Sequence, residues 1–272
     1  MSYKDKRVLL TGATGGIGRQ LAAQLCSEGA RLALVGSDAG RLESLANQLR
    51  AKGGDVLGIV ADFKQPGAVE CVVNAARQKY GSVDVLINNA GLSDFMVFEH
   101  QSLDRISEMV QVNVTTPIQL ARCLVPGFID SGCGHIVNVG SILGSIGFPH
   151  YATYSATKYA MRGFSQALRR EFQDMDIAVT YVAPRAVNTA MNDLSSIELM
   201  HATKTRLDDP ELVAALIIEA MRSKRHELYI GQPESLFAWL NGFIPLIVNF
   251  GLKQKTRFAR SYAHRALAQE NS

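Results

Sequence analysis

Short apolar runs alternate with longer amphipathic segments along most of the chain. The apolar runs have strand length and lie at 7–11, 31–35, 56–61, 83–88, 134–140, 176–182 and 227–230. Between them, apolar residues recur at helical spacing after residue 16 and in 39–52, 66–79, 102–125, 151–173 and 208–221. Strands that are apolar throughout must be covered on both faces. The pattern therefore predicts one α/β domain, a doubly wound parallel sheet with helices on both faces.

Polar residues follow several of these strands directly. Asp62 comes after the third run, Asn88-Asn-Ala-Gly91 ends the fourth, and Ser141 follows the fifth. Ligands of doubly wound sheets bind at the carboxyl ends of the strands, so we expect these residues at one site. Two structural alternatives remain open: Asp62 caps the next helix, or Asn-Ala-Gly is only a turn.

A glycine-rich turn, Gly12-Ala-Thr-Gly-Gly-Ile-Gly18, joins the first strand to the first helix. Glycines let the backbone approach a ligand closely, and the helix N-terminus directs free N–H groups at an anion. A dinucleotide pyrophosphate is the expected ligand, although a tight turn alone would also need glycine. The missing Gly-Lys-Ser/Thr ending argues against a triphosphate-binding P-loop.

Tyr154 and Lys158 lie one helical turn apart within 151–173. An ammonium beside a phenol stabilises the phenolate and lowers the phenol pKa, which makes the phenol a usable general acid or base. An isolated pair of this kind is usually a packed ring and a solvated amine. Asn113 lies among apolar residues in 102–125 and needs a partner. A hydrogen bond to main chain would satisfy it, and so would a role in positioning a lysine through water.

Composition excludes some classes of function. The 272 residues carry a net charge of +3 and the sequence pI is about 8.7, which gives no general electrostatic case for nucleic acid. Cys26, Cys71, Cys123 and Cys133 lack metal-ligand spacing and indicate reduced, mostly buried thiols, and no metal site is expected. The charged N-terminus lacks the pattern of a secretory signal, so we expect a cytoplasmic protein.

Taken together, these motifs resemble the short-chain dehydrogenase/reductase family over residues 5–231. The resemblance implies a Rossmann-type fold and an oxidoreductase that transfers a hydride between a nicotinamide cofactor and a carbonyl or secondary alcohol. Tyr154 would transfer the proton, Ser141 would orient the carbonyl oxygen, and Lys158 would lower the tyrosine pKa and hold the nicotinamide ribose. Asn113 would support a proton-relay water.

The resemblance also implies the cofactor site. Its residues would be Gly12, Thr14, Gly16, Ile17, Gly18, Ser37, Arg41, Asp62, Phe63, Asn89, Ala90, Gly91, Tyr154, Lys158, Pro184, Val187 and Thr189. NADP(H) is expected over NAD(H), because Gly36 replaces the acidic residue of NAD-selective members and Ser37 and Arg41 are available to a 2′-phosphate. Asp38 would oppose this if it turned inward. Arg185 departs from the family's usual Pro-Gly pattern.

The expected substrate is a hydrophobic ketone or a 3-oxoacyl compound. The loops 92–98, 142–150 and 190–207 are mostly apolar, and 190–207 has no clean period, which suits a mobile lid. Packing of the loops themselves would explain their apolar character equally well. The candidate substrate residues are Leu92, Leu143, Phe148, Tyr151 and Met191, and the same loops carry Phe95, Met96, Ile146 and Leu194.

Three other functions fit part of the sequence. A non-catalytic NADP-binding sensor of the same fold would keep the glycine turn and could lose Tyr154 and Lys158. A serine hydrolase would pair Ser141 with His135 or His150, but the sequence around Ser141 lacks a nucleophile elbow. A scaffold that only associates through its C-terminal part leaves the polar residues at the sheet edge unexplained.

Residues 236–272 form an extension to the predicted 1–235 domain. An apolar stretch, 236–250, precedes Lys253, Lys255, Arg257, Arg260 and Arg265. The stretch is too short to span a bilayer. We expect it to pack on the substrate side or against a second subunit. The alternative is an interfacial segment on anionic lipid. A homodimer or homotetramer is expected, since helices 102–125 and 151–173 resemble the family's pairing helices.

Overall fold

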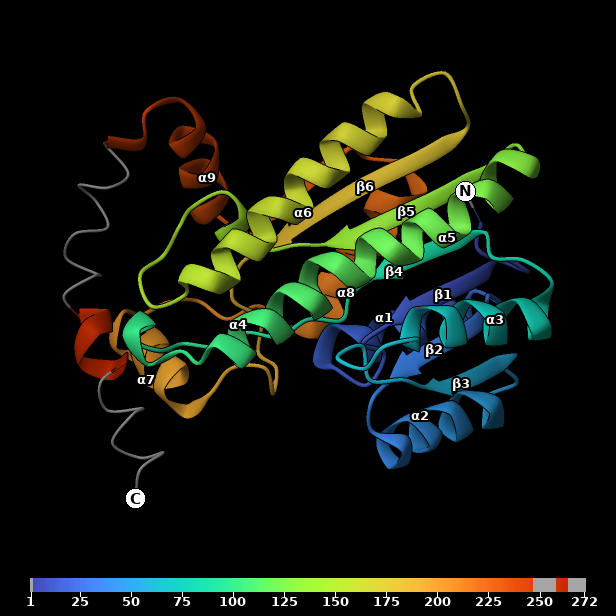
Figure 1. Cartoon of the computed structure of the whole chain (residues 1–272), viewed down its shortest axis with the longest axis horizontal. Coiled ribbons are helices and arrows are strands. Elements are labelled where there is room, and N and C mark those ends of the chain that lie inside the picture. Colours follow the sequence, from blue (N-terminus) through green and yellow to red (C-terminus); the bar gives the residue numbers. More distant parts are fainter. Residues whose placement is uncertain (1, 247–257, 264–272) are drawn as a thin grey trace.

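A sheet of parallel strands forms the centre of the computed structural model, which describes residues 2–246 and 258–263. Its seven strands follow the order β3–β2–β1–β4–β5–β6–β7 (Figure 1). They are β1 (Arg7–Thr11), β2 (Arg31–Gly36), β3 (Val56–Val60), β4 (Val85–Asn88), β5 (Gly134–Val139), β6 (Ile177–Pro184) and β7 (Glu227–Ile230). The order reverses between β1 and β4, which confirms the predicted doubly wound sheet.

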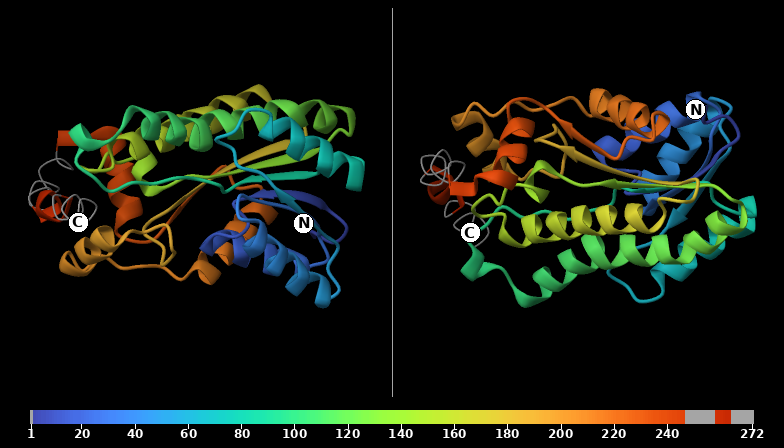
Figure 2. Two further views of the ribbon diagram at one scale, coloured as in Figure 1. Left: turned by 60° about the horizontal axis from the view of Figure 1, so that its bottom comes forward. Right: turned by 90° about the horizontal axis from the view of Figure 1, so that it is seen from above.

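Helices cover both faces of this sheet (Figure 2). One layer holds α1 (Gly16–Ser27), α2 (Ala39–Ala51) and α8 (Pro210–Arg222), and the other holds α3 (Ala68–Tyr80), α5 (Thr116–Asp130) and α6 (Ala152–Glu171). Within β1, Val8 and Leu10 pack with the first layer and Leu9 with the second. This burial on both faces is the reason that the strands are apolar throughout.

The predicted helix 102–125 has a more complex structure. It comprises α4 (Leu103–Val110), a π-helical turn at Gln111–Thr115, and α5, which ends only at Asp130. The predicted end at residue 125 is wrong because the helix continues through Pro126 and stops before Gly132, whose φ is +71°. π-Helical turns often mark functional positions. This one contains Asn113.

The segment 190–207 contains a helix that its sequence pattern does not mark. It contains α7 (Leu194–Ala202), whose N-terminus is capped by Asp193, since the carboxylate accepts a hydrogen bond from Ser196 N at 2.6 Å. The sequence did not predict this helix, and the expected mobility of the segment stays a prediction. Ser195, Ser196 and Leu199 are all buried, so small polar residues share the buried side of α7 and hide its period.

The C-terminal extension begins as a helix beside the carboxyl edge of the sheet. α9 (Glu234–Phe243) lies there, and residues 258–263 are helical and lie near α7 (Figure 1). Of the basic residues noted in the sequence, Arg260 is exposed, whereas Lys253, Lys255, Arg257 and Arg265 lie outside the described residues. Among the described helices, none has the length and apolar character needed to cross a bilayer.

The four cysteines are unpaired thiols. The expectation that most of them are buried is wrong, because Cys71 on α3 is exposed and Cys26, Cys123 and Cys133 are half-buried. All four lie away from the carboxyl edge of the sheet, where the predicted site residues gather.

Candidate active site

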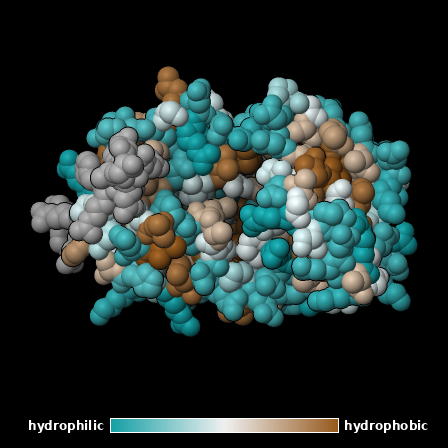
Figure 3. Space-filling model, turned by 90° about the horizontal axis from the view of Figure 1, so that it is seen from below, coloured by the Kyte–Doolittle hydropathy of each residue, from teal (hydrophilic) through white to brown (hydrophobic). Residues whose placement is uncertain are grey.

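A cavity of about 770 Å³ opens at the carboxyl edge of the sheet. Figure 3 shows the surface hollowed near the middle of one face, with apolar residues in and beside the hollow. The glycine turn, the residues after β2 to β6, the start of α6, the α7 segment and α9 line the cavity. Of the predicted cofactor residues, all line it except Gly18.

The glycine turn leaves room that side chains would fill. Gly12 has φ +62°, and a Cβ there would lie 2.8 Å from Ala90 Cα. A Cβ on Gly18 would lie 2.1 Å from the Gly12 carbonyl oxygen, so Gly18 is required for helix-to-turn packing. No side chain caps the α1 N-terminus. Its N–H groups therefore remain available to an anion, and the turn fits the pyrophosphate of a dinucleotide.

The Asn88–Gly91 segment supports this turn. Thr11 Oγ1 accepts hydrogen bonds from Asn89 N and Ala90 N, both at 3.0 Å, and the Asn89 amide donates to the Thr11 and Gly12 carbonyls at 3.1 and 3.0 Å. The segment is therefore more than a turn. It holds the end of β4 against the glycine turn.

Asp62 is a cavity residue and does not cap a helix. α3 begins at Ala68, with Gly67 at its cap position. The Asp62 carboxylate instead accepts a hydrogen bond from Lys64 N at 3.0 Å. The capping alternative is therefore wrong, and Asp62 lines the cavity beside Phe63.

Asp38, which follows β2, does not line the cavity. Asp38 caps α2, because its Oδ1 accepts a hydrogen bond from Arg41 N at 2.9 Å. Arg41 donates through its guanidinium to the Thr14 carbonyl at 3.2 Å, and both Ser37 and Arg41 line the cavity. Asp38 is thereby turned to its own helix.

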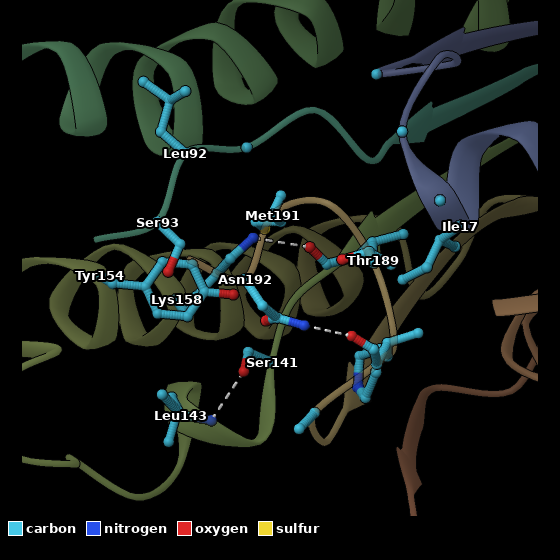
Figure 4. A pocket seen from close by; sticks show the side chains of 18 of the residues that line it. Ile17, Leu92, Ser93, Ser141, Leu143, Tyr154, Lys158, Thr189, Met191 and Asn192 are labelled. Atoms are coloured by element: carbon cyan, nitrogen blue, oxygen red, sulfur yellow. Dashed lines mark hydrogen bonds between the residues drawn. The ribbon is translucent and has the colours of Figure 1, made fainter. Parts of the chain in front are cut away.

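Tyr154, Lys158 and Ser141 converge where the half of the cavity lined by the glycine turn meets its apolar half (Figure 4). Tyr154 and Lys158 come from adjacent turns of α6, and Ser141 follows β5. Lys158 Nζ donates to the Val139 carbonyl at 3.1 Å and lies 5.5 Å from the centroid of the Tyr154 ring. Ser141 Oγ accepts from Leu143 N at 3.1 Å.

Burial is the largest influence on the pKa values of Tyr154 and Lys158. It raises the pKa of Tyr154 to about 12, while the hydrogen bond with Ser141 lowers it. Burial also lowers the pKa of Lys158 to about 8. The expected lowering of the phenol pKa by Lys158 is not found, because the pKa of Tyr154 is raised and burial is the largest cause. The phenol is therefore protonated at neutral pH.

Asn113 lies behind the cavity wall. Its Oδ1 accepts from Leu92 N at 2.7 Å, and its Nδ2 donates to the Leu92 carbonyl at 2.8 Å and to Thr157 Oγ1 at 3.1 Å. The first of the two sequence alternatives, a hydrogen bond to neighbouring main chain, is the one found. These bonds tie the segment after Gly91 to α6, one residue before Lys158.

The apolar half of the cavity has an aromatic wall. The ring of Tyr151 lies 5.2 Å from Phe95, 6.3 Å from Phe148 and 6.1 Å from Tyr154. Leu143, Ile146, Phe148, Tyr151 and Met191 line the cavity as predicted.

Three apolar candidates are placed differently. Leu92 lines the cavity as predicted, but its side chain points toward the helices and packs against the core (Figure 4). Met96 does not line the cavity, and Leu194 is 73% exposed. Phe237 and Leu240 line the cavity from the extension that was expected on its substrate side. Sequence reasoning missed Ser196 and Arg185 as cavity residues. No local pattern marks them.

His135 does not act as the base of a hydrolase triad at Ser141. His135 is buried within β5, where its Nε2 lies 2.9 Å from Thr180 Oγ1, and burial lowers its pKa to about 4. It belongs to the sheet interior.

The fold and this site define a nucleotide-dependent oxidoreductase, and comparison with known proteins identifies the class. The short chain dehydrogenase family model matches residues 6–198. Dehydrogenase/reductase SDR family member 7B of Bos taurus is 32% identical over 270 residues, covering 94% of this chain and 83% of that protein.

Two solved structures are similar in fold as well. A short chain dehydrogenase from Burkholderia cenocepacia in complex with NADP is 27% identical, with a TM-score of 0.77 over 86% of this chain and 100% of the other. The 3-ketoacyl-(acyl-carrier-protein) reductase from Brucella melitensis, complexed with NADH, is 27% identical, with a TM-score of 0.78 and the same coverage. The chain belongs to the short-chain dehydrogenase/reductase family and is an NAD(P)-dependent oxidoreductase of carbonyl and CH–OH groups.

Proposed function

We propose that this enzyme reduces a hydrophobic ketone or a 3-oxoacyl compound with NADPH, and that Tyr154 donates the proton. One observation carries the proposal: Tyr154, Lys158 and Ser141 converge between a glycine-lined half and an aromatic, apolar half of a single cavity. Such a junction brings a carbonyl carbon and a nicotinamide ring together. A cofactor with NADP chemistry supplies the hydride when bound.

Each residue has a separate task in this proposal. Tyr154 gives its hydroxyl proton to the substrate oxygen as the carbon receives the hydride. Ser141 donates a hydrogen bond to the developing alkoxide, an electrostatic contribution that often dominates catalysis. Lys158 holds the nicotinamide ribose, and Asn113 fixes the Leu92 main chain and bonds to Thr157, the residue before Lys158. Gly12, Gly16 and Asp62 hold the pyrophosphate and adenosine.

The NADP(H) preference rests on charge. Asp38 is engaged as the α2 cap, so no carboxylate repels a 2′-phosphate at the end of β2. Ser37 and Arg41 line the same part of the cavity and supply a hydroxyl and a cation. The Burkholderia cenocepacia relative is in complex with NADP and the Brucella melitensis reductase with NADH, so the relatives differ in the cofactor bound.

The substrate class rests on the cavity wall. Phe95, Phe148, Tyr151, Phe237 and Leu240 present apolar surface beside the Tyr154 hydroxyl. A substrate with an aliphatic or aromatic body gains free energy by leaving water there. The Brucella melitensis relative acts on 3-ketoacyl groups, which share this combination of a carbonyl and an apolar chain.

A panel of aliphatic, 3-oxoacyl thioester, steroid and aromatic carbonyls, each tested with NADPH and NADH, examines the proposal. We expect turnover of one or more apolar carbonyls with NADPH. The alternative, a non-catalytic NADP-binding sensor, predicts tight NADPH binding by fluorescence titration without turnover of any compound in the panel, and that result would overturn the proposal.

We also propose a homo-oligomer that pairs through α4, α5 and α6. Exposed apolar residues lie on these neighbouring helices: Leu103, Val110, Ile118, Ile129 and Tyr159. The face formed by α4, α5 and α6 is visible at the front of Figure 1. Apolar side chains gathered on one face usually mark a protein contact.

A further inference from the structure

Arg185 is a buried cation directly after β6, at the position where the chain departs from the family's Pro-Gly pattern. Its side chain is 6% exposed. The guanidinium donates to both carboxylate oxygens of Asp208, from Nε at 2.9 Å and from Nη2 at 2.7 Å. Nη1 donates to the Gln232 carbonyl at 2.8 Å and to Glu234 Oε2 at 3.0 Å.

The surrounding chain is built to accept this side chain. Gly231 has φ +97°, and a Cβ there would lie 2.4 Å from Arg185 Cδ, so the glycine leaves space for the arginine stem. A bidentate Arg–carboxylate pair is directional in a way that a lysine ammonium does not reproduce. Removing one member of a buried ion pair leaves the other without compensation. The ion pairs therefore hold Arg185, Asp208 and Glu234 in one arrangement.

The partners of Arg185 belong to two segments that wall the substrate side of the cavity. Asp208 joins the end of the segment that carries α7 to its beginning. Its N–H donates to the Ala186 carbonyl at 2.9 Å, and its carbonyl accepts from Asn188 N at 3.0 Å. Glu234 is the first residue of α9. The first segment brings Leu199 to the cavity, and α9 brings Phe237 and Leu240.

We infer that Arg185 is the positioning residue of the substrate-side wall. It ties the base of the α7 segment and the start of α9 to the end of β6, and thereby sets the distance between the two apolar walls that an extended substrate must contact. Selectivity for long over short substrates depends on this tie. The kinetic part of the inference rests on the proposed function, whereas the placement of α9 does not.

Kinetics with Arg185→Met test the tie. The variant keeps much of the apolar stem and removes the charge. We expect kcat/KM for a long-chain carbonyl to fall about tenfold or more, mainly through KM, because small displacements of contact groups are costly. Short carbonyls and the KM for NADPH should change by less than about threefold on the same argument. Equal losses for long and short substrates would contradict the inference.

Arg7→Met is the matched control. Arg7 also makes a bidentate pair, from Nε and Nη2 to Asp84 at 2.9 and 2.5 Å, but at the opposite edge of the sheet. The Arg7→Met variant removes a bidentate ion pair that is more exposed than that of Arg185 and does not line the cavity. A similar change in substrate selectivity with Arg7→Met would show that general loosening of the sheet, rather than Arg185, is responsible.

Trp239 supplies a readout that needs no substrate. It is the only tryptophan of the chain and lies on α9, with its ring 5.0 Å from that of Phe243. We expect Arg185→Met and Glu234→Ala to increase the fast component of the time-resolved anisotropy of Trp239, and Glu211→Ala, which removes an acidic residue from the first turn of α8, to leave it unchanged.

The two readouts separate the possible failures. Unchanged anisotropy in Glu234→Ala and Arg185→Met overturns the inference. If Arg185→Met does not fold, Glu234→Ala decides, since it leaves the Arg185–Asp208 pair in place. Increased anisotropy together with an enzyme that turns over no carbonyl in the panel would support the tie and reject the proposed function.

Discussion

At the scale of single residues, the site combines one phenol with an environment that keeps it protonated. Tyr154 lies between Ser141 and Lys158, and its pKa is raised to about 12 because burial disfavours the phenolate. Such an acid gives up its proton only when charge develops on a bound oxygen. This suits reduction, in which the hydride and the proton are delivered to adjacent atoms.

Tyr154→Phe should abolish turnover and leave cofactor binding almost intact. The change removes the proton donor and little volume, so we expect kcat to fall about a thousandfold. NADPH affinity, measured by fluorescence titration, should stay within about threefold because the ring remains. Lys158→Ala should impair both. Tyr159→Phe, five residues along the same helix and 41% exposed, is the control and should retain activity. A Phe variant with a tenth or more of wild-type kcat would require another acid.

His135 should make stability depend on pH. Burial lowers its pKa from 6.5 to about 4. Above pH 6.5 the ring is neutral in both folded and unfolded states. As pH falls from 6.5 toward 4, only the unfolded state gains the proton, so the native state loses stability by about 3 kcal/mol at most. Urea unfolding at several pH values measures this loss.

His135→Gln is the comparison for that measurement. The glutamine amide can take the place of Nε2 beside Thr180 Oγ1, and it does not titrate. The variant should therefore lose less stability than the wild type between pH 6.5 and 4. Parallel losses in the two proteins would assign the pH dependence to other groups.

At the scale of elements, two groups of segments line the two halves of the cavity. The turn before α1, the cap of α2 and the segment after β4 line the glycine-lined half of the cavity, and α6, α7 and α9 line the apolar half. The π-helical turn between α4 and α5 connects the halves, because Asn113 bonds to Leu92 on one side and to Thr157 on the other. An ordinary α-helical turn would present this residue at a different angle.

The start of α2 should determine the cofactor preference. We expect kcat/KM with NADPH to exceed that with NADH, and Arg41→Ala to reduce the ratio about tenfold, because a charge-assisted contact to the 2′-phosphate is lost. Arg50→Ala, at the other end of α2 and paired with Glu43, should leave the ratio unchanged. A tenfold or greater preference for NADH in the wild type would contradict the prediction.

At the scale of the whole molecule, apolar surface remains at the C-terminal end of the described chain. Ala238 is buried, but Leu236, Trp239 and Phe243 on α9 are 51%, 61% and 70% exposed. Packing among the described residues therefore does not cover them. The two hypotheses for residues 236–265, a subunit contact and an anionic lipid surface, both stay predictions.

We expect the subunit contact. Size-exclusion chromatography with light scattering should give a stable dimer or tetramer, and flotation with anionic liposomes at low salt should leave the protein in the aqueous fraction. Trp239→Ser with Phe243→Ser should weaken association if α9 takes part. Co-flotation that high salt reverses would instead favour the lipid interface.

The periodicity of the sequence was enough to define the doubly wound sheet, since strands buried on both faces must be apolar throughout. Local chemistry marked the glycine turn, Tyr154, Lys158 and Ser141 equally clearly, because each lies in a short motif or directly after a strand. Tertiary structure alone decided the direction of the Tyr154 pKa, the engagement of Asp38 with its own helix and the inward or outward course of Leu92. These depend on burial and on partners distant in the chain. Arg185 is the strongest case: Asp208 and Glu234 lie 23 and 49 residues away, and no spacing in the sequence brings them together.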